Sequence, residues 1–127
     1  MLVSSFYPRF NDTDALGHIN NATVATWFED ARRPIFQIFI PDLDPKKWNL
    51  IIARLEIDYL AQASYTDKTE IQTTLPKIGN SSMTVEQLAI QNGTQVAKGK
   101  TIMVYFDYSL NKSIPIPSDI KQKLENL

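Results

Sequence analysis

Residues 12–21 read Asp-Thr-Asp-Ala-Leu-Gly-His-Ile-Asn-Asn, and they join an extended segment to a long amphipathic helical pattern. The stretch contains two carboxylates, the only histidine of the chain and two carboxamides. Gly17 permits a tight turn, and Asn20 or Asn21 can cap the helix that follows. A carboxylate beside the free N–H groups of a helix start suits acyl chemistry, because those groups can stabilise a developing oxyanion.

Apolar residues recur after this stretch with the period of an α-helix. They are Val24, Trp27, Phe28, Ala31, Ile35, Ile38 and Phe39. Pro34 falls inside the pattern and would cost roughly 3 kcal/mol in a helix interior. We therefore expect the helix to kink or restart there, with Pro34 in a first turn. Pro41 and Pro45 end the helical stretch.

Residues 2–10 are expected to form an extended segment, which Pro8 limits to a sheet edge or a strand end. From residue 49 the apolar pattern changes to the period of two that is typical of strands. A strand with one buried face is expected over 49–59, formed by Ile51, Ala53, Leu55, Ile57 and Tyr59, and further strands are expected over 68–78, 82–91 and 94–108. Asn92-Gly93 predicts a type I′ hairpin turn.

The last strand is apolar on both faces, so it should be central in the sheet or covered on both sides. Ser118 is expected to cap a short terminal helix. One long helix followed by a meander of about four strands, with the sheet wrapped around the helix, is an α+β fold.

Composition narrows the function. The 127 residues are expected to form one domain, residues 1–127. Thirteen basic and 14 acidic residues without a basic run give no electrostatic support for binding nucleic acid. The absence of cysteine excludes disulfides, thiolate metal sites and cysteine nucleophiles, and one histidine argues against zinc, so no metal is expected. No signal peptide or membrane-spanning stretch is recognisable, which predicts a cytoplasmic protein without a membrane partner.

The motif at 12–21, followed by Trp-Phe-Glu-Asp-Ala-Arg at 27–32, resembles the hot-dog-fold thioesterases of the 4-hydroxybenzoyl-CoA thioesterase group. Later segments are similar too: the strand 53–59, the glycine-serine turn 78–82, and the closing stretches 98–99 and 114–117. The resemblance implies a hot-dog fold, with an antiparallel sheet wrapped around one long helix. It also implies at least a homodimer, with a tetramer as the alternative, and acyl thioester substrates carried by coenzyme A or by a carrier protein.

The same resemblance implies roles for individual residues. Asp14 matches the catalytic carboxylate, and the backbone N–H of Asn21 matches the donor that polarises the thioester carbonyl. His18 is a second candidate, because the run Asp-x-x-x-His-x-Asn-Asn also resembles plant acyl-carrier-protein thioesterases. Gly17 and Asn20 belong to the expected substrate-binding set. Ser81 and Ser82 are expected near the path of the pantetheine arm.

Each of these residues also has a structural interpretation. Asp14 can satisfy backbone amides in the turn at Gly17, and His18 can be a solvated turn residue. Asn20 needs no catalytic explanation as a cap, and Ser81 and Ser82 can be ordinary strand-start residues. If Asp14 is catalytic, it can attack the thioester to form an anhydride or deprotonate a water molecule.

We therefore expect an acyl thioesterase that needs no cofactor, since coenzyme A is part of the substrate. An enzyme of a different kind is the first alternative: a hot-dog hydratase or dehydratase acting on enoyl thioesters, whose sites also pair an aspartate with a histidine. The second alternative is a module that binds acyl thioesters without turnover. The acyl group, its chain length and the pathway are not determined by these patterns.

Overall fold

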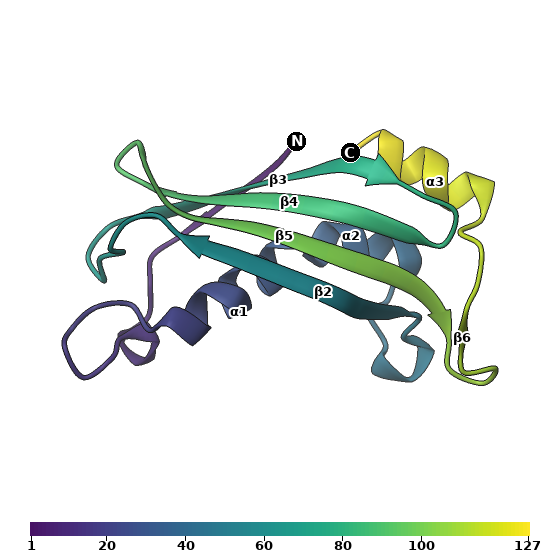
Figure 1. Ribbon diagram of the computed structural model, residues 1–127, viewed down its shortest axis with the longest axis horizontal. Coiled ribbons are helices and arrows are strands. Elements are labelled where there is room, and N and C mark those ends of the chain that lie inside the picture. Colours follow the sequence, from purple (N-terminus) through teal and green to yellow (C-terminus); the bar gives the residue numbers. More distant parts are fainter.

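The computed structural model describes residues 1–127 and shows a curved antiparallel sheet with two helices along one face (Figure 1). The helices are α1 (Asn21–Ala31) and α2 (Arg33–Phe39), and a third, α3 (Ser118–Glu125), lies near the C-terminus. The strands are β1 (Leu2–Phe6), β2 (Leu50–Tyr59), β3 (Thr69–Ile78), β4 (Ser82–Gln91), β5 (Thr94–Asp107) and the short β6 (Lys112–Ser113). This is the expected α+β hot-dog fold. No helix is both long and apolar enough to cross a membrane.

The helical stretch restarts at the expected place. Helix α1 ends at Ala31, and Arg32 serves both as its C-cap and as the N-cap of α2. Pro34 lies in the first turn of α2, where its missing N–H costs nothing. One terminal detail differs from expectation: Ser118 is the first residue of α3 rather than its cap, and Pro117 takes the cap position without a side-chain bond.

The strands run in the order β1-β3-β4-β5-β2, and every pair is antiparallel. The prediction of a simple meander is wrong for β2. The connection 60–68 does not place β3 beside β2, because β2 pairs with β5 and forms one edge of the sheet. Asn92 and Gly93 both have positive φ, 50° and 74°, as a type I′ turn requires. The central place of β5, between β4 and β2, was expected from its apolar residues on both faces.

The prediction of a single buried face for β2 is wrong. A register shift at Ala53 breaks the alternation, so Ile52 and Leu55 lie opposite the inward-facing Met103 and Thr101 of β5. Leu55 remains 41% exposed and Tyr59 52% exposed, because β2 is an edge strand with no neighbour on its outer side. The strand therefore presents apolar side chains to solvent in the isolated chain.

The core has two apolar clusters between the helices and the sheet. The cluster under α1 contains Ile19, Val24, Trp27, Phe28, Ile71, Ala89, Val96 and Ala97, and the second lies under α2 and α3. A polar network is also buried: the Arg32 guanidinium donates to Gln87 Oε1 at 3.2 Å and to Thr101 Oγ1 at 3.3 Å. Burial lowers the pKa of Arg32, and the charge of Glu29 partly opposes that shift.

Candidate active site

Asp14 lies in a tight turn that is held by its own carboxylate. Asp14 Oδ1 accepts the backbone N–H groups of Leu16, at 2.8 Å, and of His18, at 3.1 Å. The turn is closed by the Asp14 N–H, which donates to the His18 carbonyl at 2.7 Å, and Gly17 has the positive φ of 81° that favours glycine. Asp14 therefore has the structural role of satisfying backbone amides in the turn. This role uses Oδ1 and leaves Oδ2 without a hydrogen bond within the chain.

Helix α1 begins directly after this turn. The Asn20 side chain caps it by accepting the N–H of Ala22 at 2.9 Å, and the Asn20 carbonyl accepts the N–H of Thr23. The N–H of Asn21, the first helical residue, makes no hydrogen bond within the chain. It is therefore an available donor at the positive end of the helix dipole. The Tyr59 hydroxyl donates to the Asn21 carbonyl at 2.8 Å and fixes the helix start to the end of β2.

The neighbouring polar residues divide into structural and available groups. Asp12 Oδ2 accepts the N–H of Arg9 at 2.8 Å and the indole N–H of Trp27 at 3.3 Å, so this carboxylate ties the turn to α1. His18 is half-buried and holds Asp14 through its backbone only. Its imidazole has no hydrogen-bond partner in the chain and is free to meet a ligand.

Ser81 and Ser82 lie far from Asp14 within one chain. Ser81 lies in the turn between β3 and β4 and Ser82 begins β4, whereas the Asp14 turn lies at the opposite end of these strands (Figure 1). Both strands are ten residues long, so about 30 Å separates their ends. The Ser81 carbonyl accepts the Tyr105 N–H, and the Ser82 carbonyl accepts that of Gly79. A single chain therefore brings Asp14, Gly17, His18, Asn20 and Asn21 together but not the two serines.

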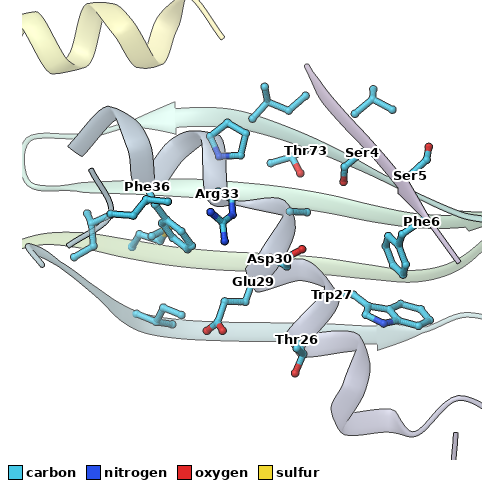
Figure 2. A pocket seen from close by; sticks show the side chains of 18 of the residues that line it. Ser4, Ser5, Phe6, Thr26, Trp27, Glu29, Asp30, Arg33, Phe36 and Thr73 are labelled. Atoms are coloured by element: carbon cyan, nitrogen blue, oxygen red, sulfur yellow. The ribbon is translucent and has the colours of Figure 1, made fainter. Parts of the chain in front are cut away.

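A groove of about 960 Å³ runs along α1 and α2 between β1 and β2. It touches Asp12, but Asp14, His18 and Asn21 do not line it. Figure 2 shows Phe6 of β1 beside Trp27 on one flank of the helix, with Thr26 and Glu29 on its other flank. The Phe6 and Trp27 rings meet edge to face, with centroids 5.1 Å apart. More than half of the lining residues are hydrophobic, 13 of 23, so the groove offers an apolar ligand a mainly apolar wall.

The structure gathers no group of three or more His, Cys, Asp or Glu side chains that could hold a metal ion. The structure also places Tyr59 beside Asn21. The sequence patterns placed Tyr59 only on a strand face. Nothing local in the sequence indicates that contact, because it joins residues 38 apart.

The fold is that of the hot-dog class, and a carboxylate turn lies at the start of its main helix. A family model described as the thioesterase-like superfamily matches residues 8–124. The chain belongs to that superfamily. The resemblance in the sequence is confirmed, and so is the class of enzyme that it implied, a thioester hydrolase.

Similar proteins point in the same direction. The structure of a predicted thioesterase from Bacillus stearothermophilus is 41% identical, with a TM-score of 0.96 over 98% of this chain and 94% of that chain. A thioesterase from Thermus thermophilus, complexed with coenzyme A and Zn, is 29% identical, with a TM-score of 0.84 over 98% of this chain and 91% of that chain. The Bacillus subtilis protein YsmA, which is uncharacterized, is 27% identical over 91% of this chain and 80% of its own length.

Proposed function

We propose that this protein hydrolyses acyl-coenzyme A thioesters, with Asp14 as the acting carboxylate and the Asn21 N–H as the oxyanion donor. The observation that carries the proposal is that both groups are unused in the turn that leads into α1. Asp14 keeps Oδ2 free, and the Asn21 N–H is unused at the start of α1. The coenzyme A bound to the Thermus thermophilus relative supports coenzyme A as the carrier. The proposed unit is a single thioesterase domain over residues 1–127.

In the proposed reaction the thioester carbonyl oxygen accepts the Asn21 N–H as the carbonyl carbon becomes tetrahedral. Asp14 Oδ2 acts by one of two routes. It either takes a proton from the attacking water or attacks the carbon itself, giving an anhydride that water then cleaves. Both routes break the C–S bond and yield a carboxylic acid and the free thiol. Neither route requires a metal or a redox cofactor.

The remaining residues of the turn have supporting roles in this proposal. Gly17 allows the backbone path that puts Asp14 beside the helix start, and Asn20 keeps that start ordered. The unpartnered His18 imidazole contacts the thioester or its thiol leaving group. The acyl group occupies the groove along α1, where Trp27 and Phe6 supply aromatic walls.

We further propose that the working form contains a second copy paired along β2. An antiparallel pair of β2 strands centred on Leu55 places Arg54 of each copy opposite Glu56 of the other. The two residues already form an ion pair within one chain, and this register repeats that complementarity across the seam. The pairing also covers the exposed edge and its apolar side chains.

The same register gives Ser81 and Ser82 a route to the substrate. It sets Tyr59 of one copy opposite residue 51 of the other. Ile51 pairs with Val104 and Val104 pairs with Ser82, so the serine turn of the second copy comes near the Tyr59 end of the first. Tyr59 holds the helix start beside Asp14. The two serines can therefore contact a pantetheine arm that a single chain would not bring to them.

The test is thiol release from short, long and aromatic acyl-CoA substrates by the wild-type protein and Asp14→Asn. The asparagine Oδ1 can still accept the Leu16 and His18 N–H groups, so we expect the variant to fold with a Tm close to that of the wild type. We expect kcat to fall by about 10²-fold or more, because the side chain can no longer act as base or nucleophile.

Equal turnover by both proteins would reject Asp14 as the acting group. Hydration of crotonyl-CoA without thiol release would indicate the hydratase alternative. Tight binding of acyl-CoA without any turnover would indicate a binding module.

A further inference from the structure

Gln91, the last residue of β4, has a side chain bonded almost entirely to one connecting loop. The residue is 5% exposed. Its Oε1 accepts the Ser64 N–H at 2.9 Å, and its Nε2 donates to the Ser64 carbonyl at 3.0 Å. Nε2 also donates to Thr69 Oγ1 at 2.9 Å and, more weakly, to the Asp67 carbonyl at 3.4 Å. The amide thus binds both backbone groups of Ser64, as a neighbouring strand would.

The loop held in this way is the connection 60–68 between β2 and β3. Its first residues are fixed to β5, because the N–H groups of Leu60 and Ala61 both donate to the Val96 carbonyl. The hydroxyl of Ser64 bonds only within the loop, to Thr66. Outside the loop, Phe10 packs edge to face against Tyr65, with the ring centroids 6.2 Å apart. Among side chains beyond the loop and β3, only Gln91 hydrogen-bonds its second half.

The connection 60–68 supports the Asp14 turn through backbone contacts. Ser64 forms an antiparallel bridge with His18, and the Ile19 N–H donates to the Ala63 carbonyl at 3.5 Å. His18 then fixes Asp14 from both sides, through its N–H to Oδ1 and its carbonyl to the Asp14 N–H. A continuous set of contacts therefore leads from Gln91 through Ser64 and His18 to the candidate carboxylate.

We propose that Gln91 is a positioning residue for the active-site turn, and this inference rests on the proposed function of Asp14. Gln91 touches no substrate. It fixes the Ser64 backbone, so that His18 holds the Asp14 carboxylate in one orientation relative to the Asn21 N–H. Small displacements of a reacting group reduce turnover strongly, so loosening this support lowers kcat more than it weakens substrate binding.

The chain supplies a matched control in Gln87. This glutamine lies two inward-facing positions before Gln91 on the same face of β4 and is 2% exposed. Its side chain accepts from Arg32 and donates to the Phe28 carbonyl and Thr73 Oγ1. None of these contacts reaches the Asp14 turn. Replacing Gln87 removes a buried amide whose bonds go to Arg32, α1 and β3 rather than to the loop, and its expected cost is the acceptor lost by the buried Arg32 guanidinium.

The experiment compares Gln91→Met with Gln87→Met, since methionine keeps the length of the side chain and removes its hydrogen bonds. We expect kcat for thiol release to fall about 10-fold or more in Gln91→Met, with KM changed less than about threefold. Hydrogen exchange over residues 12–20 should accelerate by about 10-fold or more in that variant. Gln87→Met should keep both kcat and the protection of residues 12–20 close to wild type, whatever its Tm.

Unchanged kcat and protection in Gln91→Met would overturn the proposal, and so would equal losses in both variants. The exchange measurement needs no substrate, so it decides the support of the turn even if the proposed thioesterase activity fails. Should Gln91→Met not fold, Gln91→Glu replaces it, because its carboxylate still accepts the Ser64 N–H but no longer donates. It should lose at least about threefold in kcat and lose protection over residues 12–20, whereas Gln87→Glu should keep both.

Discussion

At the scale of single residues, glycine is required at two positions for different physical reasons. Gly17 needs its positive φ, and a Cβ there would meet nothing within 4 Å. At Gly99 the constraint is space, because a Cβ would lie 2.7 Å from the Phe28 ring. Phe28 is fully buried. The close approach lets α1 pack directly on the backbone of β5.

Gly99→Ala should therefore destabilise the fold by about 1–3 kcal/mol, because the added methyl overpacks the contact with Phe28. Urea unfolding followed by circular dichroism measures the change. Lys98→Ala, at the exposed neighbouring position, is the control and should have an effect within about 0.5 kcal/mol. A Gly99→Ala protein as stable as wild type would show that the ring has room to shift.

At the scale of elements, the start of α1 both builds the fold and presents the candidate oxyanion donor. The Asn20 cap accepts the N–H of Ala22 and leaves the N–H of Asn21 free. The Ala22 N–H therefore stabilises the helix end, and the neighbouring one is available to a ligand. Tyr59 fixes the same end from β2. The helix stops at Ala31 and restarts in α2, and this break lets the helical stretch follow the curved sheet.

Asn20→Ala should destabilise the protein by about 0.5–2 kcal/mol, because the Ala22 N–H loses its acceptor. We also expect lower kcat, since fraying of the first turn displaces the Asn21 N–H. Asn20→Asp keeps an acceptor at the cap and should retain most of the stability. Thermal melts and thiol release on the three proteins measure both effects. A loss of stability in Asn20→Asp as large as that in Asn20→Ala would argue against the cap as the cause.

At the scale of the whole molecule, the outer edge of β2 has no neighbouring strand in the isolated chain. Ile52, Leu55 and Tyr59 are each more than two-fifths exposed along it. Arg54, Glu56 and Asp58 alternate with apolar residues on this strand, and Glu56 and Asp58 lie opposite Lys100 and Lys98 of β5. An edge with apolar side chains and a self-complementary charge pair suits a second copy in antiparallel register.

Arg54→Glu should weaken self-association at least about 10-fold, because it sets like charges opposite each other across the proposed seam. The double variant Arg54→Glu/Glu56→Arg should restore the association, since it exchanges the two charges. Sedimentation equilibrium at low salt measures both. A wild-type protein that stays monomeric at all concentrations would contradict the pairing, and an Arg54→Glu protein that associates as tightly as the wild type would reject this register.

Local patterns in the sequence determined much of this protein. Apolar spacing located α1, α2 and the strands β2 to β5, Pro34 marked the restart, and Asn92-Gly93 marked the type I′ turn. The turn around Asp14 was equally visible, because an aspartate, a glycine and a capping asparagine act on neighbours within a few residues. These features depend on interactions close in sequence, which composition and spacing reveal directly.

Only the tertiary structure decided which distant segments meet. It placed β2 beside β5, broke its alternation at Ala53, and separated Ser81 and Ser82 from Asp14 by the length of the sheet. It also joined Tyr59 to Asn21 and Gln91 to Ser64, at separations of 38 and 27 residues. An inward-facing glutamine shows only that a buried amide needs partners. Which partners it finds depends on long-range packing, because any correctly placed backbone group can satisfy it.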